Sequence, residues 1–430
     1  MWNERRQNGW LFLELVAVTI FLWLAIDPLF ILESRRNIPD GYNPENLYII
    51  DIKEYRTTHI KYNKNSSESS LDICRNAFNI IKSIPEVESV CTFSPGNYPN
   101  SGSVSSSLFY VDSTQTEDGE LKSFSSIIYE TTSEEGDNYP ATLGLINALT
   151  GETAHIVHDG NVNGVFVSRS FAIEGFGTLN VLGKKIKDSS GKREFVICGV
   201  IEDVPFQQYA NPHSIVLQVF PSFDFAYRGY FGICVRLKKE VDGKEFMRRF
   251  NDEYVPRLGG GNIYCSGIKS HIDERNELNE MMGHGNTYRV QTALTLFAVL
   301  CAFLGVVSTF WVRANTRRKD IGLMRSAGAS SGRIVKQFVI EAALLVTVAF
   351  VVAMPLLMHK VYAMGFAEPL VDFVARNDFN ANYIHDVAWM HFTAVSIITY
   401  IIVLLVAMIG VTIPARRIAG VLPSVALREE

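Results

Sequence analysis

The fold of this chain is decided by the stretch YRVQTALTLFAVLCAFLGVVSTFWVRANTRRKDIGLMRSAGASSGR, residues 288–333. Its first part, residues 288–312, is apolar and long enough to cross a bilayer, which takes roughly 20 residues in a helix. A helix is required because lipid offers no hydrogen-bond partner to an exposed backbone. Three further apolar spans lie at residues 10–32, 334–358 and 392–413. The sequence therefore predicts four transmembrane helices.

Basic residues predict how these spans are oriented. The segment after the second span carries many arginines and a single acid, Asp320, and the tail after the fourth span is also basic near its start. The positive-inside rule places both segments in the cytoplasm, with both chain ends inside. The expected cytoplasmic segments are 1–9, 313–333 and 414–430, and the expected external segments are 33–287 and 359–391.

Composition agrees with a membrane protein that has a large soluble part. Hydrophobic residues make up 47% of the chain, which is too few for a transporter made mostly of spans, because more than half of the residues lie outside the apolar stretches. The formal net charge of −5 says little about partners, because the positive charges are concentrated on one side of the membrane, and no nucleic-acid partner is expected. The first span has no cleavage site of the signal-peptide type after it and is expected to remain as an anchor.

The two flanks of the external segment share one pattern. Residues 46–93 and 228–285 each read as strand, helix and strand, because alternating apolar residues give way to helical spacing and back. Residues 94–227 contain short strand-like runs separated by Gly, Pro and Asp, which favours an antiparallel β module. The expected fold is an α-helical membrane domain of four transmembrane helices plus a large α/β and β extracytoplasmic domain inserted between helices 1 and 2.

Cysteine and metal-ligand patterns predict little chemistry. Five of the six cysteines fall in the external segment, so at least one thiol there is unpaired, and no Cys-x-x-Cys motif occurs. A disulfide framework is therefore not indicated, although the sequence leaves open whether any external cysteines pair. No spacing typical of a zinc site is present, and no metal is expected.

A possible catalytic motif has the wrong context. Gly328-Ala-Ser330-Ser-Gly332 matches the G-x-S-x-G nucleophile elbow, which needs a preceding strand and a histidine on the same side of the membrane. Here a basic, helix-favouring stretch precedes it, and every histidine falls on the external side. A glycine turn between two helices is the better interpretation. Nucleotide-binding motifs are also absent, so no enzymatic activity and no cofactor are expected.

Two features inside the spans suggest function or packing. Glu14 and Glu341 lie within apolar spans, where a carboxylate is a functional candidate, with snorkelling or pairing to the basic loop as the alternative. We favour the alternative for Glu14 and leave Glu341 open. Ala298, Ala302 and Gly305 put small residues on one side of span two, so another helix can approach closely, from this chain or from a second one.

Two cytoplasmic motifs carry a resemblance to a known family. RRKDIGLMRSAGAS, residues 317–330, and PARRIAGVLPSVALR, residues 414–428, resemble the loop and tail signatures of MacB/FtsX-type ABC transporter permeases, also called type VII or mechanotransmission permeases. Residues 165–170 and 195–205 are similar to the MacB-like periplasmic core domain. Two residues, Met324 and Ser326, depart from the usual loop signature.

The resemblance implies a non-catalytic permease subunit in a bacterial cytoplasmic (inner) membrane. Its loop would be a coupling helix seated on a separate cytoplasmic ABC ATPase dimer, which binds the ATP. Ile321, Met324 and Ala327 recur at helical spacing, and we expect them to enter a groove on the ATPase while arginines meet its acids. The expected coupling residues are Arg317, Arg318, Asp320, Ile321, Gly322, Met324, Arg325, Gly328 and Ala329.

The resemblance also implies partners and two alternative roles. A second permease copy or a paralogue, membrane lipid and a periplasmic partner are expected. Work done in the cytoplasm would change the shape of the external domain, for export or extraction of peptide, lipoprotein or hydrophobic compounds. The alternative is an FtsX-like signalling transducer that regulates a periplasmic enzyme or adaptor without transport.

Overall fold

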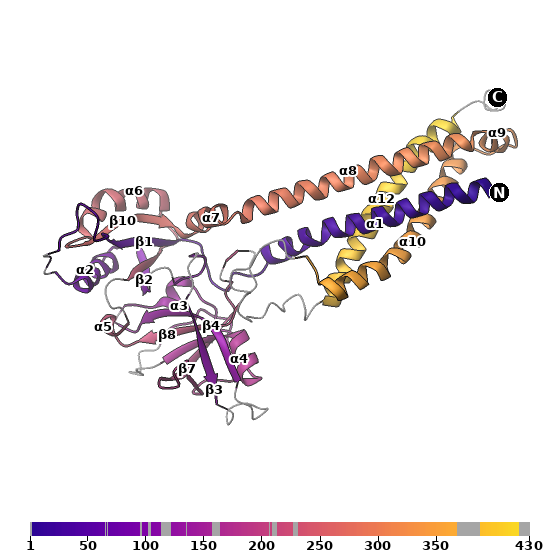
Figure 1. Cartoon of the computed structure of the whole chain (residues 1–430). Coiled ribbons are helices and arrows are strands. Elements are labelled where there is room, and N and C mark those ends of the chain that lie inside the picture. Colours follow the sequence, from indigo (N-terminus) through magenta and orange to yellow (C-terminus); the bar gives the residue numbers. More distant parts are fainter. Residues whose placement is uncertain are drawn as a thin grey trace. The chain divides into compact units, whose positions relative to one another are not determined.

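The structure is a computed structural model that describes residues 2–420, except 65, 67, 95–96, 102–104, 113–121, 135, 157–163, 206, 209–212, 227–230 and 368–387. Among the described residues, those up to Ser34 and from His284 onward form one compact unit, and Arg35–Gly283 form the other. We call them the membrane unit and the soluble unit. Figure 1 shows the helices of the first and the sheets of the second.

In the residues that the structure describes, the membrane unit contains four long apolar helices and one short one. The long helices are α1 (Trp2–Arg36), α8 (His284–Thr316), α10 (Ser331–Met364) and α12 (Ala388–Ala419), and the short one is α9 (Arg318–Ser326). The four long helices are apolar and long enough to cross a membrane. Each extends beyond the apolar span seen in the sequence, because a helix continues into polar flanks as long as its backbone hydrogen bonds continue.

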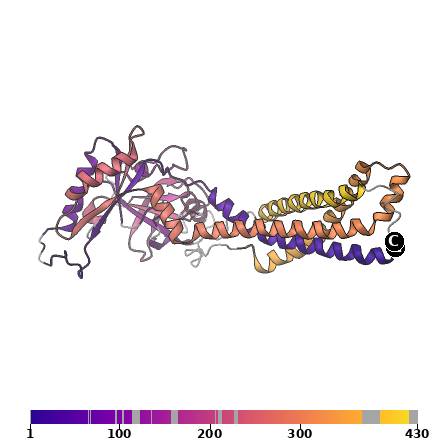
Figure 2. The same cartoon turned by 90° about the horizontal axis from the view of Figure 1, so that it is seen from above.

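Small residues bring the membrane helices close together. Ala298, Ala302 and Val306 are buried on α8, at intervals of four residues that place them on one face. A Cβ atom at Gly410 of α12 would lie 3.2 Å from a methyl group of Val307, so a side chain there would force a shift of a few tenths of an ångström. Figure 2 shows α8 running along α12. Large apolar side chains such as Leu and Phe lie on the outward surfaces, as lipid contact requires.

The α10 helix stays continuous at its proline and is packed through alanines. It passes through Pro355 without a break, and Ala349 and Ala353 are fully buried. Alanine therefore supplies a small packing surface on this helix.

One sheet of the soluble unit is built from both flanks of the segment. Strands β1 (Leu47–Glu54), β2 (Val87–Phe93), β9 (Gly232–Leu237) and β10 (Ile263–Ser270) pair antiparallel in the order β10-β1-β9-β2. Alternate residues of β1 face α2 (Ser70–Lys82) and α6 (Gly243–Glu253), which cover one side of the sheet. Ser69 and Asp242 cap these two helices by accepting backbone N–H bonds. Helix α7 (His271–Met281) follows β10 directly.

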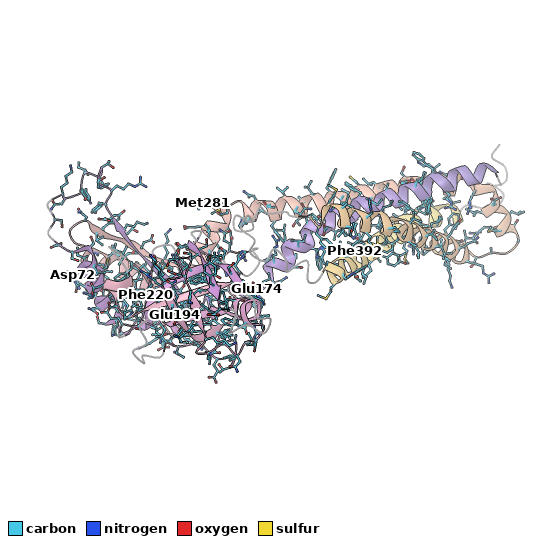
Figure 3. The ribbon with its side chains drawn as sticks, turned by 60° about the horizontal axis from the view of Figure 1, so that its bottom comes forward. Asp72, Glu174, Glu194, Phe220, Met281 and Phe392 are labelled. Atoms are coloured by element: carbon cyan, nitrogen blue, oxygen red, sulfur yellow. The ribbon has the colours of Figure 1, made fainter. Side chains whose placement is uncertain are left out.

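The remaining strands close into a barrel. They are β3 (Ser105–Val111), β4 (Lys122–Thr132), β5 (Gly164–Ser168), β6 (Lys185–Lys187), β7 (Glu194–Ile201) and β8 (Ile215–Phe220), in the order β3-β4-β8-β5-β7-β6. Short helices α3 (Tyr139–Leu143) and α4 (Arg169–Phe176) lie between them in sequence, and α5 (Phe223–Ala226) follows β8. Apolar side chains fill the barrel, and Figure 3 shows the side chains of this unit, with Phe220 of β8 and Glu194 of β7 labelled.

The prediction of a purely antiparallel module is wrong in part. Strands β4 and β8 pair parallel, and so do β5 and β7. The chain between β5 and β7 contains α4, which supplies the crossover that a parallel pair needs.

An acid is buried where the sheet meets the barrel. Asp137 accepts hydrogen bonds from the backbone N–H and the hydroxyl of Thr92 on β2, and from the hydroxyls of Thr131 and Thr132 on β4. It is completely buried. Burial raises the pKa of Asp137 to about 7, and the hydrogen bonds limit that rise. The carboxyl therefore joins the two halves of the soluble unit.

Candidate coupling surface and intramembrane ion pairs

Helix α9 is set between α8 and α10 by a defined turn. Gly328 has a φ of 92°, its N–H donates to the carbonyl of Arg325, and the N–H of Ala329 donates to that of Met324. This pair of bonds is a Schellman motif, in which the left-handed position favours glycine. The Ser330 side chain then accepts the N–H of Arg333 and caps α10. The interpretation of this segment as a glycine turn between two helices is confirmed, and Ser330 is a helix cap.

The exposed face of α9 differs from the predicted one. Ile321 is 3% exposed and belongs to the core of the membrane unit, so the prediction that it enters a partner's groove is wrong. Leu323 is 65% exposed and Met324 is 39% exposed. Gly322 is buried, and Asp320 and Ala327 are exposed. Asp320, Leu323, Met324 and Ala327 share one helical face, which we call the α9 surface.

Two of the predicted coupling arginines are bound within the chain. Arg317 forms an ion pair with Glu341 at 2.9 Å. Arg325 donates to the hydroxyl of Ser331 and to the carbonyl of Ala419 at the end of α12. These contacts brace α9 against α10 and α12, and a role of the two arginines in binding a partner stays a prediction. Arg318 is half-buried at the first position of α9.

Glu341 pairs with two arginines and joins three consecutive helical elements. It receives Arg313 from the end of α8 and Arg317 from the start of α9, while it lies on α10. The Arg313 side chain is only 9% exposed, so its charge is largely removed from water. Pairing with the basic loop, one of the two alternatives left open, is what the structure shows. A buried charge that depends on one acid makes this cluster sensitive to change.

A cavity adjoins this ion-pair cluster. It has a volume of about 320 Å³ and lies between α9 and α10. Its walls include Ile321, Leu323, Met324 and Phe338, and the polar side chains of Arg317, Asp320, Gln337 and Glu341 complete the lining. The α9 surface and the ion-pair cluster are therefore parts of one continuous site.

Glu14 lies in a different polar contact. Its Oε2 accepts a hydrogen bond of 2.6 Å from the Thr309 hydroxyl on α8. A Cβ atom at Gly305 would lie 3.3 Å from its Oε1, so the small residue makes room for the carboxylate. Ala298 and Ala302 are buried inside the chain. The three predicted small residues therefore serve packing within this chain, and a role between two copies stays a prediction.

A buried acid and histidine pair was missed by the sequence analysis. Asp27 Oδ1 accepts a 2.8 Å hydrogen bond from His391 Nε2 on α12, and its Oδ2 accepts the N–H of Ala367. Both side chains are buried, and the His391 ring contacts Phe30 and Phe366. Figure 3 labels Phe392, the next residue, whose ring lies 5.6 Å from that of Trp23. An acid within the first span was the available signal, but its partner is far away in sequence.

The comparisons with known proteins agree with the sequence motifs. Residues 292–423 match the family model described as FtsX-like permease C-terminal. The macrolide export ATP-binding/permease proteins MacB of Salmonella choleraesuis and Salmonella typhimurium are each 26% identical over 199 residues, covering 44% of this chain. The chain spans 29% of the length of these relatives.

Solved structures also match the chain. The periplasmic region of MacB from Actinobacillus actinomycetemcomitans aligns with 58% of this chain and 97% of its own, at 14% identity and a TM-score of 0.35. The extracellular domain of the noncanonic ABC-type transporter YknZ from Gram-positive bacteria aligns with 51% of this chain and 100% of its own, at 14% identity and a TM-score of 0.32.

The family-model match includes residues of the two motifs that first suggested the resemblance. The family model covers both the loop and the start of the tail. The recognition is confirmed: the chain carries an FtsX-like permease domain and has the MacB proteins among its homologues.

Proposed function

We propose that this permease couples a separate cytoplasmic ATPase to movement of its soluble unit, and that the α9 surface is where the ATPase binds. The observation that carries the proposal is the exposure of Leu323 and Met324 on a short helix between two apolar ones. Exposed apolar side chains in a basic loop are costly in water and favour a protein partner.

The contacts around α9 would let a force on it reach the membrane helices. Glu341 holds the end of α8, the start of α9 and the body of α10 through Arg313 and Arg317. Arg325 holds the other end of α9 to α12. A displacement of α9 would therefore move α8, α10 and α12 together. The chain continues from α7 to α8 through Gly283, so α8 is also the element that follows the soluble unit in sequence.

The direction of this coupling requires α9 in the cytoplasm and the soluble unit outside, in the inner membrane. The distribution of basic residues supports this orientation. Two such chains, or this chain and a paralogue, would form the working permease with lipid around them. Export of hydrophobic compounds is the role we favour, because its homologues are described as macrolide export proteins.

The proposed ATPase contact can be tested by adding one negative charge to the α9 surface. We expect Leu323→Asp to abolish co-purification of the ATPase, because the added carboxylate would have to be desolvated in the interface. Ser326→Asp is the matched control, since it adds the same charge to the same helix away from the centre of the α9 surface. The measurement is a pull-down from detergent-solubilised membranes. Retained binding by Leu323→Asp at wild-type level would refute the α9 surface.

The orientation can be tested by labelling single cysteines in a cysteine-free background. Ser189 and Ser326 are both exposed, on the soluble unit and on α9 respectively. We expect an impermeant maleimide to label Ser189→Cys in intact spheroplasts, and Ser326→Cys only after permeabilisation, because the charge pattern places them on opposite sides. The reverse labelling pattern would invert the topology and remove the coupling proposal.

A further inference from the structure

Two cysteines of the soluble unit face each other across neighbouring strands. Cys91 on β2 and Cys234 on β9 are directly paired in the antiparallel register, and both side chains belong to the same buried apolar cluster. Paired residues of antiparallel strands have Cα atoms about 4.5 to 5.5 Å apart, which lies within the range that a disulfide spans. Both residues are free thiols here and are almost completely buried, at 0% and 1% exposure.

The other cysteines lack this arrangement. Cys74 lies on α2, Cys265 pairs in register with Ile52, and Cys301 lies on α8. Cys198 on β7 is directed to the carbonyl of Val165. A small apolar residue could fill the volume of either buried thiol, so burial alone does not explain cysteine at both facing positions.

The position of the pair gives a bond between them a structural effect. The chain leaves the sheet for the barrel after β2 and returns at β9, so Cys91 and Cys234 stand where the barrel begins and ends. A covalent link there would close residues 91–234 into one loop. Closing a long loop restricts the unfolded chain strongly and stabilises the folded one.

We propose that Cys91 and Cys234 form a cross-strand disulfide that closes the base of the barrel. The proposal rests on the placement of the soluble unit outside the cytoplasm, where disulfides persist. The oxidant is a disulfide-bearing molecule, such as an extracytoplasmic thiol oxidase or oxidised glutathione. One cysteine thiolate attacks the oxidant's disulfide and forms a mixed disulfide, and the second cysteine thiolate then attacks the bonded protein sulfur. The oxidant leaves as two thiols, having taken up two electrons and the two protons.

Burial indicates when this exchange takes place. Desolvation, followed by the neighbouring Cys234 thiol, raises the pKa of Cys91 well above its ordinary value, so the folded protein holds almost no reactive thiolate there. The bond therefore forms while β2 and β9 are pairing and before the core closes over them. Once formed, it is shielded from reductants in the same way.

The state of the pair can be read from the full-length protein. Cells are quenched in acid, the protein is denatured and alkylated with N-ethylmaleimide without reductant, and tryptic peptides are analysed by mass spectrometry. We expect the peptides that contain Cys91 and Cys234 to be linked, and those with Cys74 and Cys265 to be alkylated. A Cys74→Ala variant should keep the link. Recovery of Cys91 and Cys234 both alkylated would overturn the proposal.

Two further experiments distinguish the possible reasons for finding no disulfide in cells. Purified protein is warmed with oxidised glutathione near its melting temperature and cooled, then digested as before. Failure to link even there refutes the geometry, whereas linking there alone refutes the bond in cells. Labelling of Ser189→Cys reports the orientation independently. If the bond is present, a reductant should lower the melting midpoint by about 5 °C or more in the wild type and leave Cys91→Ala/Cys234→Ala unchanged.

Discussion

Replacing Glu341 by Ala is expected to lower the stability of the membrane unit by on the order of 3 kcal/mol, because it leaves the buried Arg313 without a counter-charge. The result should be a fall in melting midpoint of on the order of 10 °C for the chain in detergent, measured by scanning fluorimetry. ATPase association should weaken as well, since α9 loses its tie through Arg317.

Two controls make this result specific. Arg313→Leu/Glu341→Leu should recover most of the lost stability, because the charge of the more buried arginine is removed together with that of Glu341, whereas Arg317 is 27% exposed. Glu14→Ala should cost far less, since the Thr309 hydroxyl that it accepts can instead donate to a carbonyl of its own helix. Equal losses of stability for Glu14→Ala and Glu341→Ala would contradict the claim that the ion pairs with Arg313 and Arg317 make Glu341 the more important of the two acids.

The soluble unit is expected to lose stability as pH rises, through Asp137. Its pKa is about 7 when folded and near 3.8 when unfolded, so the folded state binds the proton more tightly. The resulting stabilisation is fully present below about pH 4 and is lost as pH rises through 7. The full difference corresponds to about 4 kcal/mol. Asp137→Asn should remove this dependence, because an amide does not titrate.

The buried His271 has the opposite effect on the pH dependence of stability below about pH 6.5. Burial, followed by the nearby Arg275 charge, lowers the pKa of His271 to about 4. The stabilisation that neutral His271 contributes is fully present above about pH 6.5 and is lost as pH falls through 4. Between these pH values, the change in stability due to His271 is therefore opposite to the change due to Asp137. His271→Asn should therefore reveal the decline due to Asp137. Amide hydrogen exchange of β2 and β4 at pH 5 and pH 8, corrected for intrinsic rates, measures both. A wild type and an Asp137→Asn variant with the same dependence would contradict the assignment.

The sequence predicted elements well and the direction of side chains poorly. Four apolar spans and the alternation at Leu47–Glu54 are local patterns, and the structure has helices and a strand there. In α9, by contrast, Ile321 and Leu323 are both apolar, so no local pattern decides which one faces inward. Packing against the neighbouring helices decides it, and Ile321 is the buried one.

Contacts between distant residues were also beyond the reach of the sequence. Asp27 and His391 meet only because α1 and α12 pack together, and neither position has a motif around it. The parallel pairing of β4 with β8 depends in the same way on the route of the chain. Glu341 was found because a carboxylate within an apolar span is unusual, whereas its two partners required the turn at Thr316 and Arg317.

The way the barrel joins the sheet has an evolutionary consequence. Phe93 and Gly232 are register partners at the ends of β2 and β9, and a Cβ atom at Gly232 would collide with the Phe93 ring. The two strands therefore end side by side, as the arms of an ordinary hairpin do, and a turn of a few residues could join them. The whole barrel can be regarded as an expanded hairpin loop. Descendants of this architecture could enlarge or shrink the barrel without altering the strand order of the sheet, provided that the sheet residues packed against it, such as Leu47 and Phe93, stay covered.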